Sequence, residues 1–91
     1  MNKSLNQIET DIVENGILSD EDIEAFREID TMMSVTTLAW ATKVCHEAVV
    51  RLKENKSILY NGIPLTEESF KNLLNDNLSD FFVRRIYTYN S

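Results

Sequence analysis

Apolar residues recur at helical spacing through one long stretch, residues 19–56, which contains no glycine and no proline. As a single straight helix this stretch would be about 55 Å long, whereas a compact chain of 91 residues is only about 30 Å across. Ser34, Thr36 and Thr37 favour a break between residues 31 and 37, because their hydroxyl groups compete for backbone hydrogen bonds. The pattern predicts two helices that meet at a kink, or one long helix shared with a second chain.

The second half of this stretch is unusually apolar. Five of its residues step by three and four and form a narrow seam typical of paired helices: Leu38, Ala41, Cys45, Ala48 and Leu52. Four more widen the seam: Val35, Trp40, Val44 and Val49. Because a helix this apolar should be covered on more than one side, we expect the seam to be the interface of a homodimer. Met32, Met33 and Trp40 are either core residues or an exposed contact surface.

Start and stop signals divide the rest of the chain. Ser4, Ser19 and Thr66 each precede a helical pattern and predict N-caps. Gly16 predicts the end of the first helix, because glycine accepts the left-handed conformation found there. Asn61-Gly62 is a strong hairpin signal, although Pro64 weakens one arm. We therefore expect an ordered turn, with or without a small hairpin.

The tail, residues 78–91, fits either a helix that begins at Ser79 or a strand that joins the hairpin. We favour the helix and expect an all-α fold, a small helical bundle of four or five helices around a long, kinked central helix, in a single domain over residues 1–91. The alternative is an α+β fold with a tiny C-terminal hairpin or sheet. The expected core around residues 35–52 comprises Ile8, Ile12, Phe26, Phe70, Leu73, Leu74, Phe82 and Ile86.

The net charge of −6 is concentrated at one end of the chain. Residues 1–30 contain two basic and nine acidic side chains, a net of −7, so the remainder is nearly neutral. Such a field repels nucleic acid and attracts basic protein surfaces. It also has a simpler explanation, because carboxylates in a first turn stabilise a helix. We expect an acidic partner-binding ridge formed by Glu9, Asp11, Glu14, Asp20, Glu21, Asp22, Glu24 and Glu28.

Candidate chemistry is sparse. Cys45 and His46 are adjacent on a helix, so they point about 100° apart and cannot act as a nucleophile and its base. Cys45 is expected to be a buried, inert thiol, and His46 a surface residue. The acidic residues lack the spacing of a calcium loop. We predict no catalytic residue, no metal site and no cofactor, and therefore no enzyme.

Arg84 and Arg85 are the one place where basic residues mix with aromatic ones, as nucleic-acid binding requires. Two arginines in an acidic chain are few, so direct nucleic-acid binding is the alternative rather than the main expectation. A small ligand held between subunits is a third possibility.

The main expectation is a non-enzymatic protein that inhibits or regulates a basic, nucleic-acid-handling partner. Small acidic helical chains of this kind occur among phage-encoded inhibitors, including anti-CRISPR and anti-sigma proteins. Residues 62–74, GIPLTEESFKNLL, resemble a turn-and-helix stretch of T-even phage anti-sigma proteins, and the resemblance covers 13 of the 91 residues. The lone cysteine, and a first segment without the apolar core of a signal peptide, predict a cytoplasmic protein without a membrane span.

Overall fold

The long apolar stretch breaks where the sequence predicts. In a computed structural model, which describes residues 3–32 and 34–89, it forms two helices, α2 (Asp20–Thr31) and α3 (Val35–Lys53). Met32 is extended, and the Ser34 hydroxyl accepts a hydrogen bond from the backbone N–H of Thr37, which begins α3. Met33 lies outside the described residues. The two helices thus fit into a molecule of 33 × 29 × 24 Å.

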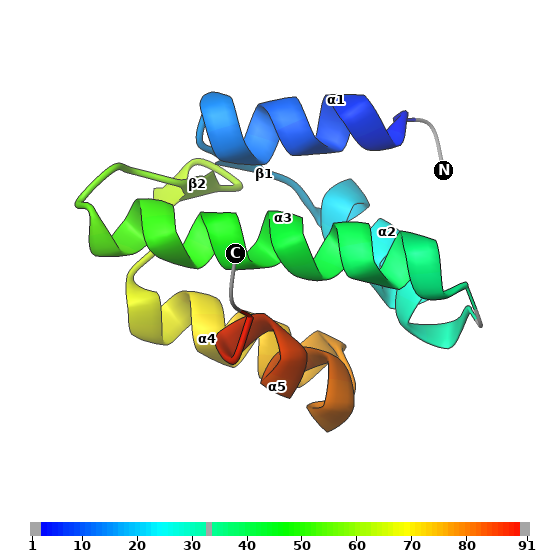
Figure 1. Ribbon diagram of the computed structural model, residues 1–91. Helices are drawn as coiled ribbons and strands as arrows, with labels where there is room; N and C mark the ends of the chain where they lie inside the picture. The colour runs from blue at the N-terminus through cyan, green and yellow to red at the C-terminus, as the bar shows by residue number, and fades with distance from the viewer. Residues whose placement is uncertain (1–2, 33, 90–91) are drawn as a thin grey trace.

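The described chain contains seven further elements (Figure 1). Four are helical: α1 (Leu5–Glu9), the π-helical turn η1 (Thr10–Glu14), α4 (Glu67–Asn77) and α5 (Asp80–Tyr87). Three are strands: β1 (Ile17–Leu18), β2 (Leu59–Tyr60) and β3 (Ile63–Pro64). Every α-helix begins at a serine or threonine whose hydroxyl accepts a backbone N–H of the first turn.

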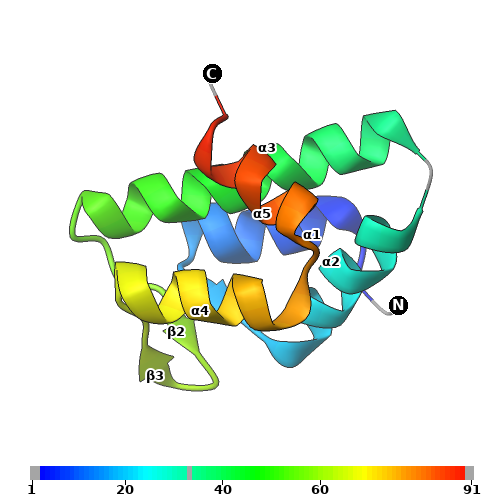
Figure 2. The same cartoon turned by 90° about the horizontal axis from the view of Figure 1, so that it is seen from below.

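Helix α3 is the central element. It contacts η1, α2, α4 and α5. Figure 1 shows it running across the molecule between α1 and the pair formed by α4 and α5, and Figure 2 shows α5 between α3 and α4. Of the expected core residues, seven are buried: Ile8, Ile12, Phe26, Phe70, Leu74, Phe82 and Ile86. Leu73 is partly buried against them. Val35 was expected in the apolar face but is 79% exposed, because it lies in the first turn of α3, beyond the elements that cover the helix.

The fold is mainly helical with a small sheet, which corrects the all-α expectation. Asn61 and Gly62 have φ values of 51° and 81°, and their turn pairs β2 with β3 in an antiparallel hairpin. Strand β1 joins β2 in parallel, with Ile17 opposite Leu59. The small sheet agrees with the alternative of an α+β fold with a tiny hairpin or sheet, although the tail does not join it as a strand. The tail is instead helix α5, and the third strand comes from residues 17–18.

A close approach of backbone segments fixes the sheet to the helices. Gly16 is buried with φ of 67°, and its carbonyl accepts the N–H of Leu59 at 2.8 Å. The Arg51 guanidinium lies beside it and donates to the carbonyl oxygens of Val13 at 3.0 Å and Ser57 at 2.9 Å. A Cβ atom on Gly16 would lie 2.4 Å from the Ser57 oxygen and 2.6 Å from Arg51 Nη2. Glycine is therefore required at this position both for conformation and for space.

Gly16→Ala should lower the free energy of unfolding by at least about 2 kcal/mol, because strain in the left-handed conformation adds to a steric clash. The control is Gly62→Ala, where φ is also positive but no atom lies within 4 Å of the added Cβ. Gly62→Ala should lower the free energy of unfolding by about 1 kcal/mol. Urea denaturation followed by circular dichroism measures both, and equal losses would show that the space around Gly16 is not limiting.

Candidate interaction surfaces

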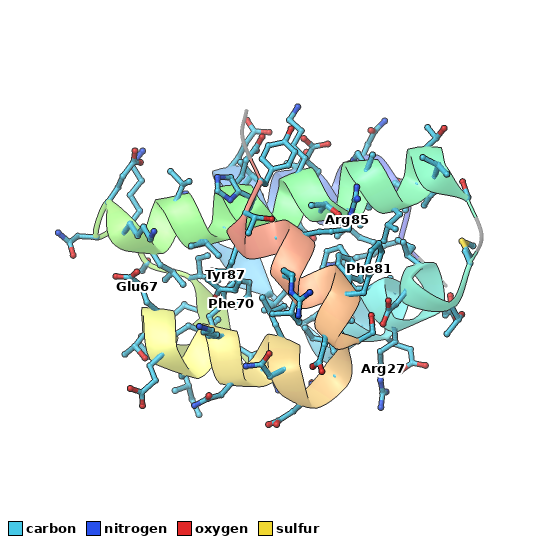
Figure 3. The ribbon with its side chains drawn as sticks, turned by 60° about the horizontal axis from the view of Figure 1, so that its bottom comes forward. Arg27, Glu67, Phe70, Phe81, Arg85 and Tyr87 are labelled. Carbon is cyan, nitrogen blue, oxygen red and sulfur yellow. The ribbon has the colours of Figure 1, made fainter. Side chains whose placement is uncertain are left out.

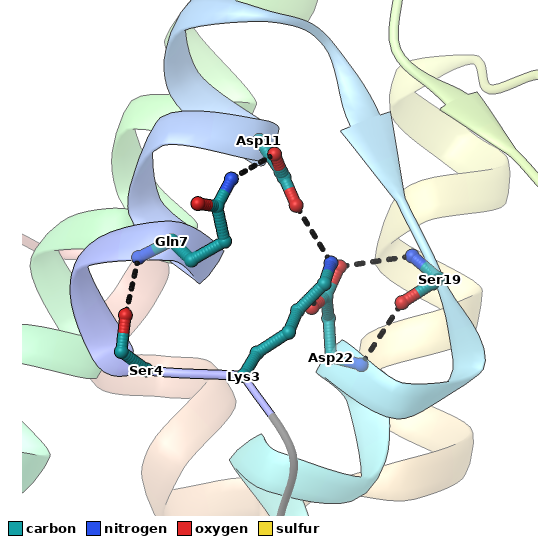
Figure 4. Close-up of polar contacts among 6 residues, drawn as sticks. All are labelled: Lys3, Ser4, Gln7, Asp11, Ser19 and Asp22. Carbon is teal, nitrogen blue, oxygen red and sulfur yellow. Dashed lines mark hydrogen bonds and ion pairs between the residues drawn. The ribbon is translucent and has the colours of Figure 1, made fainter.

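The acidic N-terminal third contains a buried charge network (Figure 4). The Lys3 ammonium lies 2.7 Å from Asp11 Oδ2 and 3.1 Å from Asp22 Oδ1. Asp22 is fully buried, and its second oxygen accepts the backbone N–H of Ser19 at 3.0 Å. The Ser19 hydroxyl accepts the N–H of Asp22 in return, which completes a capping box. Lys3 thus neutralises the carboxylate that caps α2.

These contacts shift the pKa values of Lys3 and Asp11, the two partly buried members of the network. Desolvation lowers the pKa of Lys3, but hydrogen bonds and attraction from Asp11 and Asp22 outweigh it, so the pKa of Lys3 is raised overall. The hydrogen bond from Lys3 lowers the pKa of Asp11, and a further hydrogen bond from Gln7 acts in the same direction. The ion pairs are therefore strongest between the two pKa values, across the neutral range.

Three other carboxylates hold distant segments together. Glu9 accepts the indole N–H of Trp40 at 3.1 Å. Asp20 accepts the Tyr60 hydroxyl at the hairpin, and this hydrogen bond raises the pKa of Tyr60. Asp30 accepts both the backbone N–H and the hydroxyl of Ser79, each at 2.8 Å, and so supports the start of α5.

The acidic ridge expected from the sequence is therefore smaller in the structure. Asp22 cannot belong to it, because the capping box turns its carboxylate into the protein. Glu9, Asp11 and Glu21 are partly buried, and Glu14 is exposed at the end of η1. Asp20, Glu24 and Glu28 are exposed and recur every four residues along α2, and we call them the acidic face. Arg27, on the same side of α2, pairs with Glu24 at 2.6 Å.

The apolar seam of α3 is not available to a second chain. Ala41, Cys45, Ala48 and Leu52 are buried within the protein, and Leu38 is partly buried. The expectation that these residues form an oligomer interface is thus wrong, because η1, α2, α4 and α5 together cover the apolar face of α3. The elements that cover this face belong to the same chain. The apolar pattern of α3 alone could not show whether the covering residues come from the same chain or from a partner chain.

Cys45 lies in the core, and His46 contacts the end of α5. Burial raises the pKa of the Cys45 thiol far above its ordinary value, so little thiolate is available at neutral pH. His46 Nδ1 lies 2.9 Å from the carbonyl oxygen of Ile86, and since a carbonyl only accepts, Nδ1 carries the proton. The imidazole also packs against the Tyr89 ring, with centroids 5.1 Å apart. His46 therefore attaches the end of α5 to α3.

His46 and Tyr89 also line an open hollow of about 300 Å³, together with Arg51 and Lys56. Glu47 and Glu54 bring negative charge to the same hollow, so its walls carry both signs. Across residues 3–32 and 34–89, no three His, Cys, Asp or Glu side chains are grouped so that they could hold a metal ion.

Apart from Val50 and Ile63, the exposed large apolar side chains fall into two groups. Ile17, Leu59 and Pro64 lie opposite one another across the sheet, and the first two are 49% and 38% exposed. A second group surrounds a hollow of about 270 Å³ where the junction of α2 and α3 meets α5. Its lining residues are Asp30, Met32, Ser34, Val35, Leu38 and Phe81. Sequence reasoning did not single out Phe81; its neighbour Phe82, about 100° away on α5, is the core residue.

Comparisons with protein-family models, with curated proteins and with solved structures find no match for this chain. The resemblance of residues 62–74 to anti-sigma proteins therefore rests on those residues alone. In the structure they form the end of the hairpin and the first two turns of α4, where Thr66 and Ser69 form a capping box. Fold and surface define a small, mainly helical protein with a three-stranded sheet and both acidic and apolar exposed surfaces.

None of the helices in the described part of the chain combines the length and apolar character needed to cross a bilayer.

Lys3→Met should lower the free energy of unfolding by about 2 kcal/mol, because the fully buried Asp22 loses its counter-charge. Lys56→Met is the matched control, since its ion pair with Glu54 is exposed on both sides and should be worth less than about 0.5 kcal/mol. Urea denaturation at neutral pH measures both. A loss for Lys3→Met no larger than for Lys56→Met would show that Asp22 does not depend on Lys3.

The free energy of unfolding should decrease as the pH falls below 3.8, the ordinary pKa of the Asp11 carboxyl. The pKa of Asp11 is lowered in the folded protein, so its stabilising charge is present above 3.8 and is lost as the pH falls through the folded value. Denaturation curves between pH 2 and pH 7 should show a smaller decrease for Asp11→Asn than for the wild type. Equal decreases would mean that other carboxyl groups account for the whole acid transition.

Proposed function

We propose that this chain is a non-enzymatic regulator or inhibitor that binds a basic surface of a nucleic-acid-handling protein through its acidic face. The observation that carries the proposal is the row formed by Asp20, Glu24 and Glu28 on the exposed side of α2. Four residues of helix rise about 6 Å, so these carboxylates form a regular line of negative charge. A groove that holds a nucleic acid backbone is built to receive such a line.

Charge distribution supports the same proposal. The net charge of the chain is −6, and residues 1–30 account for it. Glu9, Asp11, Asp20, Asp22 and Asp30 are engaged by the chain's own donors, so their charges contribute mainly to the field rather than to direct contacts. Glu28, and Glu24 beside its ion pair with Arg27, are exposed members of the acidic face that can make direct ion pairs with a partner. Long-range attraction and local contact thus favour the same class of partner, a basic protein surface.

The surroundings of Cys45 and His46 support a binding role rather than catalysis. The thiol lies in the core, and the imidazole N–H is held by the Ile86 carbonyl. Both residues thereby contribute to packing. A single buried thiol also suits the cytoplasm, where we expect this protein to act, as phage-encoded inhibitors of the anti-CRISPR and anti-sigma kind do.

Nucleic-acid binding through Arg84 and Arg85 is the alternative. Both arginines are exposed on the last turn of α5. Of their aromatic neighbours, Phe82 is buried and Tyr87 is half-buried beneath Lys71, whereas Phe81 is exposed but lies under the Arg85 guanidinium. An electrophoretic mobility shift with duplex DNA at increasing salt concentration tests this alternative. Binding that weakens steeply with salt would support it.

The variant Glu24→Lys/Glu28→Lys tests the acidic face. Immobilised wild-type protein should retain basic nucleic-acid-binding proteins from a host lysate, and duplex DNA should elute them. Reversing both charges should reduce this DNA-eluted fraction by about ten-fold or more. Melting temperature should change little, because both side chains are exposed.

Glu68→Lys/Asp76→Lys provides the matched control. These two carboxylates are also exposed but lie on α4, so the variant carries the same change in net charge at another place. It should retain partners as the wild type does. If both variants lose binding equally, net charge rather than the acidic face is responsible, and if neither loses binding, the proposal is wrong.

A further inference from the structure

The exposed side of α5 combines an aromatic ring with two arginines. Phe81, Arg84 and Arg85 are spaced by three and four residues, so they lie on one side of the helix, and all three are exposed. The Arg85 guanidinium lies over the Phe81 ring, 5.6 Å from its centroid (Figure 3). We call these three residues the basic face.

The chain itself does not neutralise the two arginines. It has 15 acidic and 9 basic side chains, so carboxylates are not scarce. Four of the other basic side chains each pair with a carboxylate: Lys3, Arg27, Lys43 and Lys56. Within residues 3–32 and 34–89, by contrast, no carboxylate forms an ion pair with Arg84 or Arg85, not even Asp80 one turn before Arg84. Two positive charges therefore remain available for anions from outside the chain.

The Phe81 ring also forms one wall of the hollow of about 270 Å³ between α5 and the α2–α3 junction. Met32 and Val35 line the same hollow and are 50% and 79% exposed. Asp30 contributes a carboxylate to the wall, but both of its oxygens accept hydrogen bonds from Ser79. Pockets for whole small molecules usually measure about 300–1,000 Å³. The hollow is thus of a size that suits a single apolar side chain.

We propose that the basic face and the hollow together bind an acidic segment of a partner protein, in which a large apolar residue lies beside Asp or Glu residues. The apolar side chain enters the hollow against Phe81, and the carboxylates pair with Arg84 and Arg85. Guanidinium groups suit this role, because their planar fork binds a carboxylate through two parallel hydrogen bonds. Recognition of acidic motifs by grouped arginines is a recurring mode of peptide binding.

Nucleic acid fits this surface less well. Its many phosphates must approach a chain with a net charge of −6, and two arginines neutralise only two of them. A base would stack on Phe81, where the Arg85 guanidinium already lies over the ring. A short acidic segment brings only a few negative charges, and it supplies an apolar side chain for the hollow.

This inference goes beyond the proposed function, because it concerns a second surface of opposite charge. The acidic face lies on α2 and the basic face on α5. The two surfaces share no residue, so each can be altered by substitution while the other is kept. A chain with both faces joins a basic protein surface to an acidic segment.

Selection from a displayed library of short random peptides tests the proposal. The library is first passed over the variant Arg84→Gln/Arg85→Gln, which removes peptides that bind elsewhere, including basic peptides held by the acidic face. The remaining peptides are then selected on the wild-type protein. The enriched sequences should contain Asp or Glu beside a large apolar residue. Enrichment of sequences without acidic residues, or no enrichment, would overturn the proposal.

Fluorescence anisotropy of the enriched peptides tests the role of the hollow. Phe81→Ser should raise their Kd by about ten-fold or more, and its circular dichroism spectrum should stay that of the wild type because Phe81 is exposed. Lys43→Gln/Lys53→Gln is the matched control for charge, since it removes two exposed cations from α3. It should bind the peptides as the wild type does. Unchanged binding by Phe81→Ser, or weak binding by the lysine variant, would contradict the proposed site.

The acidic face and nucleic acid are tested with the same variants. Glu24→Lys/Glu28→Lys should bind the enriched peptides at least as tightly as the wild type, and Phe81→Ser should still retain basic proteins. Failure of one proposal is therefore distinguishable from failure of the other. If no peptide is enriched, and duplex DNA binds the wild type but not Arg84→Gln/Arg85→Gln, the basic face is a nucleic-acid site and the proposal is wrong.

Discussion

The structure depends on one arginine that joins three backbone segments. From the last turns of α3, Arg51 donates hydrogen bonds to the end of η1 at Val13 and to the loop after α3 at Ser57. Gly16 fits between them because it lacks a side chain, and its carbonyl then accepts the N–H of Leu59. This contact sets the register of β1 on β2, and the hairpin in turn directs the chain into α4. A two-residue strand has too few hydrogen bonds to specify its own register, so the guanidinium supplies the missing constraint.

Much of the fold could be predicted because local signals mark almost every boundary. Ser4, Ser19, Thr66 and Ser79 are N-caps in the structure, as their positions before apolar periodic segments predict. Asn61-Gly62 forms the hairpin turn, for the same kind of local reason. Strand β1 could not be predicted, since two residues carry no alternation and its pairing depends on contacts about 40 residues away along the chain. The π-helical turn η1 likewise has no sequence signature in this chain.

The candidate surfaces were harder to predict than the fold, because exposure depends on tertiary contacts. The sequence marks nine carboxylates as a group, but the capping box turns Asp22 into the protein, where Lys3, nineteen residues earlier, pairs with it. Periodicity identifies the apolar face of α3 correctly and cannot tell whether the cover comes from the same chain or from another. The exposed apolar hollow depends on where α5 lies against the α2–α3 junction, which no local pattern fixes. What sequence reasoning could identify were the residue types and the helix faces, and not which of them remain at the surface.

The arrangement around α3 also orders events during synthesis. Residues 3–53 leave the ribosome before α4 and α5, and they include the whole of α3 but only part of the cover of that helix. The rest comes from α4 and α5, which are made after α3, and Asp30 lies at the end of α2, where it accepts hydrogen bonds from Ser79 at the start of α5. A nascent or prematurely terminated chain that lacks α4 and α5 would expose the apolar seam of α3 to other proteins. The exposure ends when these two helices pack against α3.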